Sequence, residues 1–361
     1  MQTTSISRKY WAVGIIFLFI GACIIPSCAQ LTEKSYQGSR KTIITVDDDG
    51  DGDYTSISDA VNHSHPGDII EVYSGTYAEV QILIKTPNIT LIGLSYEPDG
   101  GNHTGKPLIV TKGYNWLIKV QANNVTVSNF SIQANNSGGK PPFQGPFIDL
   151  YYVNGCRISN NTIQNGTSYN EGVRCCNTSY IQINDNVIKN VDLEGIQITD
   201  SNNDSVNGNV IIHSNNGIQI EFSEAINVTK NKVNGCGTGI DLSNSQNNAL
   251  YLNNLENNSL GVHLEFSTKN IIKHNNFIKN SQKAEWEAYK FLIIQRWKSI
   301  FNSWIDNYWG HRWIVPKMIP GILYLILLTI YTPEFGPVPI AIPLPFFQFD
   351  RHPAQTPYTI P

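Results

Sequence analysis

The chain has 361 residues, a formal net charge of −4 and only 15% charged residues. Because it lacks the excess of Lys and Arg that binding to a phosphate backbone requires, nucleic acid is excluded as a partner class. A repeat of about 22 residues makes the length a poor guide to the number of domains.

The first thirty residues are typical of an export segment. Arg8 and Lys9 precede an uncharged apolar run over residues 10–25, and Ser27-Cys28-Ala29 resembles a small-residue cleavage site. Three outcomes stay open: cleavage of residues 1–29 as a signal peptide, lipid attachment at Cys28, or retention as an N-terminal membrane anchor. All three predict an exported protein, extracellular or at the cell surface.

Residues 41–121 are expected to form an N-terminal cap and the first coils of a solenoid. Short apolar strands are predicted at 43–46, 69–73, 80–84, 89–92, 108–110 and 117–120, and residues 58–63 predict a short helix that covers the open edge. Asp47, Asp49 and Asp51 are spaced as at the start of a calcium-binding loop, but Ser58 stands where that loop requires a glutamate. We interpret this stretch as an acidic turn with weak calcium binding as the minor alternative, and we expect no other cofactor.

Residues 122–281 carry two repeated patterns with the same spacing. An apolar residue stands three positions before and another two positions after each of six asparagines: Asn161, Asn186, Asn209, Asn231, Asn253 and Asn275. A Gly-x-x-x strand pattern follows the first five, beginning at Gly172, Gly195, Gly217, Gly239 and Gly261. A leucine-rich repeat would need a Leu-rich second half, whereas here both halves read as strands. The pattern therefore predicts an all-β, right-handed parallel β-helix.

The recurring asparagines are predicted to be structural. In a parallel β-helix each coil lies about 4.8 Å from the next, so equivalent side chains stack directly. Stacked inward amides can bond one another in a ladder, as in cross-β assemblies. This gives them partners within the core and leaves little reason to treat them as ligand groups.

The outward positions of the glycine-led strands supply the candidate site. One predicted column holds Arg174, Gln197, Gln219, Asp241 and His263, and the next holds Cys176, Thr199, Glu221, Ser243 and Glu265. Glu221, Asp241, His263 and Glu265 should meet on one face, with Glu221 and Asp241 roughly 8 Å apart on the diagonal. That separation suits inverting glycoside hydrolysis. Any stacked carboxylates on a solvated surface would share it, so this face is a hypothesis for ligand binding or catalysis.

Residues 282–361 are expected to cap the solenoid. Trp286, Tyr289 and Trp297 recur at helical spacing and predict an amphipathic helix over residues 285–301. Ten of the eighteen prolines fall in residues 316–361, which argues against long regular structure there. The apolar run 319–331 is too short to favour a membrane span and is expected to be buried.

The cysteines after the export segment are Cys156, Cys175, Cys176 and Cys236. Cys175 falls in an inward column and is expected to be a buried thiol. A bridge from Cys156 to Cys175 or Cys176 stays open, and no spacing indicates a metal site.

The chain resembles a known group of proteins in its opening motifs and repeats. The runs Gly52-Asp53-Tyr54-Thr55-Ser56-Ile57, Asp59-Ala60-Val61, Pro66-Gly67-Asp68 and Gly75-Thr76-Tyr77 are similar to the opening of the pectin-lyase-like right-handed β-helices. With the Asn and Gly repeats, the chain most resembles periplasmic copper-binding NosD-like and archaeal surface proteins. The resemblance implies the β-helix fold and an association with copper-site maturation. Met1 and Met318 are the only methionines, so soft copper ligands are scarce, and no family catalytic motif can be matched.

These observations favour an exported, surface-attached β-helix protein that binds polysaccharide or a cell-envelope glycan. A glycoside hydrolase or polysaccharide lyase acting on the same face is the first alternative. A structural or adhesive envelope protein, or a NosD-like metal-maturation factor, is the second.

Overall fold

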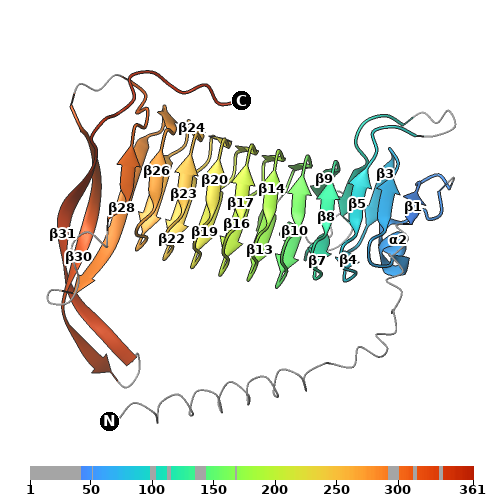
Figure 1. The fold of residues 1–361 in the computed structure, drawn as a ribbon, viewed down its shortest axis with the longest axis horizontal. Coiled ribbons are helices and arrows are strands. Elements are labelled where there is room, and N and C mark those ends of the chain that lie inside the picture. Colours follow the sequence, from blue (N-terminus) through green and yellow to red (C-terminus); the bar gives the residue numbers. More distant parts are fainter. Residues whose placement is uncertain are drawn as a thin grey trace, which may run out of the picture. The chain divides into compact units, whose positions relative to one another are not determined.

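The computed structural model describes residues 42–50, 52–97, 103–111, 115–134, 144–166, 169–291, 301–311, 315–332 and 336–361. These residues form a right-handed parallel β-helix, in which short strands of each coil pair with the same strands of the next coil (Figure 1). The fold class predicted from the repeat is confirmed, and the leucine-rich alternative is excluded.

Each coil contributes strands to three stacks. The first stack holds β1 (Ile43–Val46), β2 (Ile69–Val72), β5 (Thr90–Gly93), β8 (Thr126–Ser128), β11 (Arg157–Ser159), β14 (Gln182–Asn184), β17 (Ser205–Asn207), β20 (Asn227–Thr229), β23 (Ala249–Tyr251), β26 (Ile271–Lys273) and β29 (Ser303–Ile305). The second holds β4 (Ile82–Ile84), β7 (Ile118–Val120), β10 (Gly145–Tyr151), β13 (Asn170–Cys176), β16 (Glu194–Thr199), β19 (Asn216–Glu221), β22 (Thr238–Ser243), β25 (Leu260–Glu265) and β28 (Gln282–Phe291). The third holds β3 (Thr76–Glu79), β6 (Leu108–Thr111), β9 (Ser131–Ala134), β12 (Thr162–Gln164), β15 (Val187–Lys189), β18 (Val210–Ile212), β21 (Lys232–Asn234), β24 (Asn254–Glu256) and β27 (Asn276–Ile278).

The core is a set of apolar columns that run along the stacks. Ile198, Ile220 and Leu242 pair in register on consecutive coils, and all three are fully buried. Outward residues alternate with them, because successive side chains of a strand point to opposite faces. The period-two pattern of the sequence therefore decides which residues reach the surface.

The six repeat asparagines form a continuous buried ladder. Asn209 Oδ1 accepts from the backbone N–H of Asn186 (2.9 Å) and from its Nδ2 (3.0 Å), and Asn209 Nδ2 donates to Asn231 Oδ1 (3.0 Å). Asn209 Nδ2 also donates to the carbonyl of Ile183 (2.8 Å). The ladder satisfies the backbone at a corner where no strand pairing is available.

Further polar ladders, which the sequence analysis did not identify, hold the other corners. Ser201, Ser223, Ser245 and Ser267 each accept from the backbone N–H of the preceding coil. A second amide column includes Asn248, Asn270 and Asn302. Asp204 occupies this same type of position, where its carboxylate accepts from Ile181 N (2.8 Å) and Thr178 Oγ1 (2.9 Å).

Asp204→Asn is expected to stabilise the fold above pH 6. Burial raises the pKa of Asp204 to about 6, although the hydrogen bonds that its carboxylate accepts from Ile181 and Thr178 lower the pKa. The contribution of Asp204 to stability is therefore fully present below about pH 3.8, the ordinary pKa of an aspartate, and is lost as the pH rises through about 6. Asparagine keeps the acceptor without the charge, so at pH 8 the variant should gain up to about 3 kcal/mol. Urea unfolding at pH 4 and pH 8 checks this, and an equal gain at both pH values would contradict it.

The glycine of each repeat is required by close packing between coils. A Cβ on Gly217 would lie 2.3 Å from Val233 Cγ1 and 2.5 Å from the Gly239 carbonyl oxygen. Only glycine fits such an approach of two backbones. The following residue, Ile218, is also buried, so the strand carries a local irregularity at this point.

A short helix closes the N-terminal coil, close to where the sequence predicts one. Helix α2 (Ile57–His63) buries Ile57, Ala60 and Val61, and the Ser56 side chain caps it by accepting from Asp59 N. Glu79, on β3, accepts from Ile57 N (2.7 Å) at the same helix end. Strand β3 was not among the predicted strands.

The helix expected over residues 285–301 is wrong where the structure describes it. Residues 282–291 form β28, which continues the second stack, with Trp286 paired to Leu264. Ala284, Trp286 and Ala288 alternate inward and are buried, so a period of two prevails over the helical spacing of the aromatics. Residues 292–300 lie outside the described part of the chain.

The expectation that prolines prevent long strands in residues 316–361 is also wrong. β30 (Lys317–Thr332) and β31 (Gly336–Asp350) form an antiparallel hairpin that extends from the last coil (Figure 1). β31 pairs with β30 along one edge and with β29 only at Asp350. Pro343 and Pro345 stand two apart on this edge strand, where a missing N–H costs no ladder bond.

Three smaller observations complete the fold. Cys156, Cys175, Cys176 and Cys236 are free thiols, so the structure has no bridge from Cys156. No helix in the described ranges is long and apolar enough to cross a membrane. Of the apolar run 319–331, Ile319, Leu323 and Ile326 are buried.

Candidate functional site

The outward side of the second stack brings together the four candidate residues as their register predicts, but Asp241 is buried at 9% exposure and not exposed as expected. Asp241 pairs with Gln219 on one side and with His263 on the other, and Ser243 lies between Glu221 and Glu265. Glu285 continues the column of His263 on β28. We call this set the carboxylate face: Gln219, Glu221, Asp241, His263, Glu265 and Glu285.

His263 is held between two carboxylates. Its Nδ1 lies 2.9 Å from Asp241 Oδ1, and its Nε2 lies 3.8 Å from Glu285 Oε1. Burial opposes the charged form, but the hydrogen bond to Asp241 and the negative charges of Asp241, Glu285 and Glu265 outweigh burial and raise the pKa of His263. The imidazolium form therefore persists to higher pH than in a free histidine, and it fixes both neighbouring carboxylates.

A second set of contacts continues the network toward the N-terminal coils. Gln219 Nε2 lies 3.1 Å from Glu221 Oε1 and 3.5 Å from Asp241 Oδ2, so one amide spans both carboxylates. Ser243 Oγ donates to Glu265 Oε2 (3.1 Å). Burial, followed by the charges of Asp241, Glu265 and Asp200, raises the pKa of Glu221. The raised pKa keeps this carboxyl group protonated to higher pH than an ordinary glutamate.

The same face carries acidic groups that the sequence analysis did not identify. Glu171 and Glu194 immediately precede repeat glycines; Glu171 is only 9% exposed and Glu194 8%. Burial, then the charges of Glu171 and Glu221, raises the pKa of Glu194 to about 7. The glycine that follows each of them could have predicted their outward position. The strand is irregular at that glycine, so the inward and outward alternation changes for the residue before it. Glu285 was missed because residues 285–301 were assigned to a helix.

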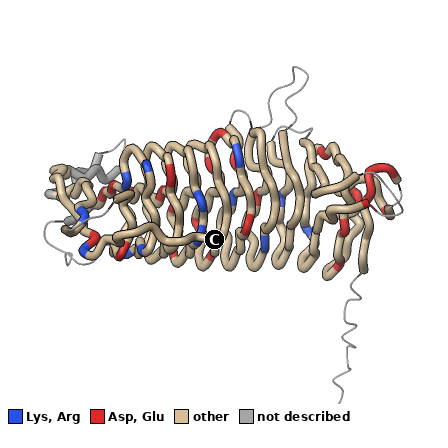
Figure 2. The backbone as a smooth tube through the Cα atoms, turned by 90° about the horizontal axis from the view of Figure 1, so that it is seen from above, with Lys and Arg blue, Asp and Glu red and all other residues tan. Residues whose placement is uncertain are grey.

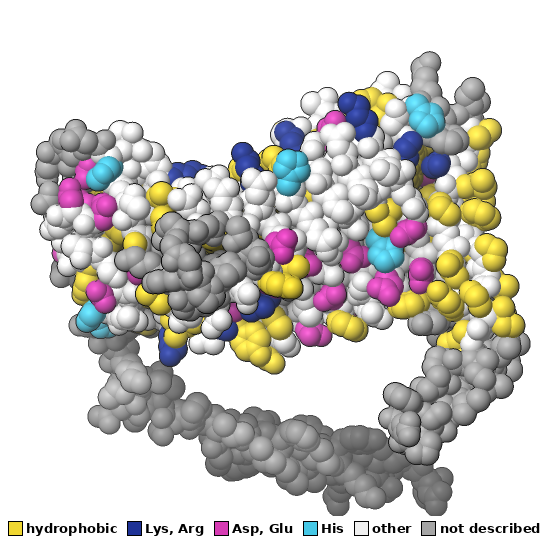
Figure 3. All heavy atoms as spheres, turned by 180° about the vertical axis from the view of Figure 1, so that it is seen from behind, with side chains coloured by type: hydrophobic (Ala, Val, Ile, Leu, Met, Phe, Trp, Pro, Cys, Tyr) yellow, Lys and Arg dark blue, Asp and Glu magenta, His cyan; other side chains and the backbone are white. Residues whose placement is uncertain are grey.

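The N-terminal end of the same column is neutralised by ion pairs. Asp149, fully buried, contacts Lys119 Nζ (3.0 Å) and Arg174 Nε (3.0 Å). Arg174 NH1 also lies 3.6 Å from Glu171. Uncompensated negative charge is therefore concentrated on the later coils, and Figure 3 shows acidic side chains gathered there, beside the hydrophobic hairpin.

Aromatic side chains border the carboxylate face at one corner. Tyr152, Phe222 and Phe266 occupy equivalent corner positions on different coils and have positive φ (55°, 47° and 49°). Tyr152 is 64% exposed and Phe222 60% exposed. The same corner has positive φ on the intervening coils, at Asn177, Asp200 and Asn244, so the turn itself requires this conformation. These rings present flat apolar surfaces next to a row of hydrogen-bond acceptors.

A separate apolar pocket of about 910 Å³ lies at the base of the hairpin. It is lined by Val315, Met318, Phe347 and Phe349, among others, and carries Lys317 and Arg351 at its edge. It contains no acidic residue and does not overlap the carboxylate face.

The metal donors of the described residues do not gather into a set that suits copper. Cys156, Cys175 and Cys236 are buried at separate places, and burial raises the pKa of each thiol. In the described ranges, the group of three donors close enough to share an ion is Asp47, Asp49 and Glu97. Carboxylate oxygens suit hard cations rather than copper, so this donor set does not fit a copper site.

Comparison with known proteins gives a family and a fold. The family model described as periplasmic copper-binding protein (NosD) matches residues 100–311. A search of curated proteins finds no matching sequence.

Among solved structures, XylC with xylose aligns at 12% identity over 74% of this chain and 68% of that chain, with a TM-score of 0.49. DFA-IIIase from Arthrobacter chlorophenolicus A6 in complex with GF2 aligns at 12% identity over 68% and 76%, with a TM-score of 0.48. An exopolygalacturonase from Thermotoga maritima aligns at 11% identity over 81% and 90%, with a TM-score of 0.42. At these identities the likeness concerns the path of the chain and not its chemistry.

Proposed function

The chain belongs to the NosD family, whose model matches more than half of its length, and from this premise we propose that it is a periplasmic or extracellular β-helix protein that binds a neutral polysaccharide. The ligand would lie along the carboxylate face. The proposal depends above all on the fixed row of acceptors formed by Glu221, Asp241, Glu265 and Glu285 around His263.

The chemistry of this row favours sugar hydroxyls. Carboxylates accept charge-assisted hydrogen bonds, which are stronger than neutral ones, and a sugar offers several hydroxyl donors per residue. Coils repeat every 4.8 Å or so, which presents the acceptors in a regular line to an extended chain. Phe222 and Phe266, two coils or about 10 Å apart, offer surfaces for the apolar faces of sugar rings.

The sign of the charge narrows the ligand class. The carboxylate face holds four carboxylates and one histidine, Glu194 lies beside it, and the basic partners Lys119 and Arg174 pair with Asp149 on earlier coils. A uronic-acid polymer would bring further negative charge into this partly buried surface, where like charges are costly. Neutral or amino sugars meet no such penalty.

Hydrolysis at the same face is the second candidate. Burial and three neighbouring carboxylates raise the pKa of Glu221, which is the property a proton donor to a leaving oxygen needs. Asp241 could then serve as the base for water, as in inverting enzymes. Shortened products in the presence of a bound glycan would favour this candidate over simple binding.

A glycan array tests the proposal. The purified full chain, with its N-terminal segment in detergent, is applied to neutral, amino and uronate oligosaccharides at pH 7. Binding to neutral or amino glycans of several residues is expected, with little binding to uronates. Binding confined to uronates, or to none, would contradict the proposal. Any bound glycan is then incubated with the protein and its length is followed by mass spectrometry.

A further inference from the structure

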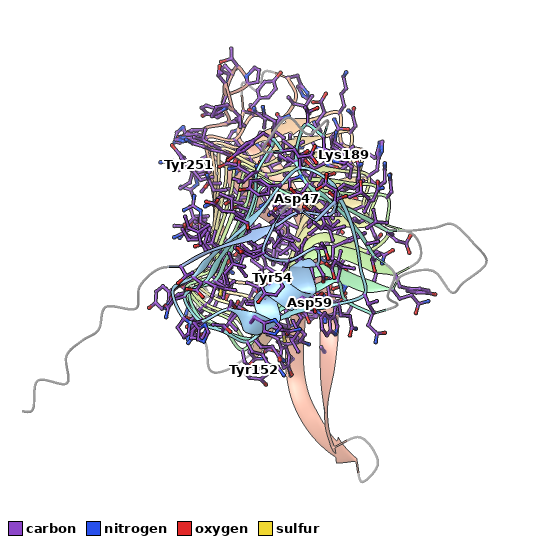
Figure 4. All side chains as sticks on the ribbon, turned by 90° about the vertical axis from the view of Figure 1, so that its right-hand side faces the viewer. Asp47, Tyr54, Asp59, Tyr152, Lys189 and Tyr251 are labelled. Atoms are coloured by element: carbon purple, nitrogen blue, oxygen red, sulfur yellow. The ribbon has the colours of Figure 1, made fainter. Side chains whose placement is uncertain are left out.

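Three carboxylates meet at the N-terminal end of the solenoid, far along the coils from the carboxylate face. Asp47 follows β1, Asp49 lies two residues later, and Glu97 lies beyond β5 on a later coil. One oxygen from each lies within 4.8 Å of the others. Figure 2 shows Asp and Glu gathered at this end, and Figure 4 places Asp47 there, in the view along the coils.

The burial of Asp47 distinguishes this cluster from an ordinary acidic surface. Asp47 is 1% exposed, and neither of its carboxylate oxygens has a hydrogen-bond partner among the described residues. Burying a carboxylate without a partner is costly. Burial, followed by the charge of Asp49, raises the pKa of Asp47 to about 6, although the nearby backbone N–H of Asp49, which does not meet hydrogen-bond geometry, lowers it.

The positive charge that would offset the cluster is not supplied by the described side chains. Glu97, whose side chain is 3% exposed, lies 3.2 Å from His103 Nδ1 and accepts from His103 N (2.7 Å). No Lys or Arg of the described ranges forms an ion pair with Asp47, Asp49 or Glu97. Three converging carboxylates therefore face one partly exposed histidine.

The loop that carries Asp47 and Asp49 is fixed at its base. Asp47 N donates to the Tyr54 carbonyl (2.9 Å), and Tyr54 N donates to the Thr45 carbonyl (3.1 Å). Asp53 Oδ2 accepts from Thr45 N (2.8 Å) and from Thr45 Oγ1 (2.9 Å). These bonds hold the carboxylates in place before any ligand arrives, which lowers the cost of binding.

We propose that Asp47, Asp49 and Glu97 bind a calcium ion that ties the loop after β1 to the segment after β5. Calcium takes oxygen ligands at about 2.3–2.6 Å, so ligands on opposite sides of the ion can stand about 5 Å apart, which accommodates a 4.8 Å cluster. Magnesium requires about 2.0–2.1 Å and near-ideal octahedral geometry and retains several waters, so three carboxylates from two separate segments suit the more flexible shell of calcium better. Water and backbone carbonyls complete the shell.

This ligand set differs from the one the sequence suggests. The spacing of Asp47, Asp49 and Asp51 predicts a local loop, whereas the structure adds Glu97, which is distant in sequence. Asp51 lies outside the described residues. Glu97 could not be assigned from the sequence, because only the stacking of the first coils brings it to Asp47.

Isothermal titration with CaCl2 tests this site on the full chain, after removal of metal with EDTA. We expect one ion per chain with a Kd of about 10⁻⁴–10⁻³ M, the range of extracellular calcium modules. Glu97→Gln and, separately, Asp49→Asn should weaken binding at least about tenfold. Asp49 is exposed, so its substitution leaves the packing intact. Glu71→Gln on β2 makes the same change of charge outside the cluster and should leave the Kd unchanged.

Two results would overturn the proposal. The first is the absence of a binding isotherm at 10 mM CaCl2, about ten times the weakest expected Kd. The second is a Kd that is the same in the wild type, Glu97→Gln and Asp49→Asn. Tighter binding of MgCl2 than of CaCl2 would overturn the choice of calcium. Glycan binding plays no part in these readouts, so they are independent of the proposed function.

Discussion

Replacing Asn209 by alanine is expected to lower the free energy of unfolding by about 3 kcal/mol, the cost of leaving two buried groups without partners. Asn209 Oδ1 accepts from the backbone N–H of Asn186, and Asn209 Nδ2 donates to the carbonyl of Ile183. Alanine can replace neither bond, and Asn209 is fully buried, so water cannot enter to compensate. The damage should extend to neighbouring coils, because Asn186 and Asn231 also lose an amide contact.

Urea unfolding followed by far-UV circular dichroism measures this effect. Asn227→Ala is the matched control, since Asn227 is exposed on β20, one coil further on. The control should shift the unfolding midpoint little. Equal midpoints for Asn209→Ala and the control would show that the ladder does not stabilise the solenoid.

The repeat predicted the register of the coils because a one-residue slip would be very costly. Such a slip would turn Ile198, Ile220 and Leu242 outward and place Gln219 and Asp241 in the core. The same constraint places Asp241 beside His263. Where every second residue is apolar and the period is fixed, the outward neighbours follow directly.

The C-terminal region could not be predicted in the same way, because its pattern fits two periods. Trp286, Tyr289 and Trp297 follow a helical spacing, while Ala284, Trp286 and Ala288 follow a strand spacing. The edge of β25 supplies the deciding interaction, since it offers unpaired backbone groups to β28. Because the local pattern favoured a helix and the tertiary pairing favours a strand, the sequence did not predict Glu285 as part of the candidate site.

The double change Asp241→Ala and His263→Ala is expected to weaken glycan binding by at least about 100-fold, the loss of two charge-assisted hydrogen bonds. Asp241 and His263 hold each other at 2.9 Å, and His263 also faces Glu285. Removing both therefore deletes contacts and frees Glu285 from its fixed position. Affinity in the wild type should fall as the pH rises above the ordinary histidine pKa of 6.5, because the imidazolium that orders these carboxylates is lost once the pH passes the raised pKa of His263. In the double variant this dependence should disappear.

The measurement that tests the central claim most directly is isothermal titration of the array-selected glycan into the wild type and this double variant at pH 6. Asn207→Ala with Thr229→Ala is the control, because these residues form a stacked, hydrogen-bonded polar pair (2.9 Å) on the first stack. The account predicts binding by the wild type and the control and at least about 100-fold weaker binding by the Asp241 and His263 variant. Equal affinity in all three folded proteins would contradict it and place the ligand elsewhere on the solenoid.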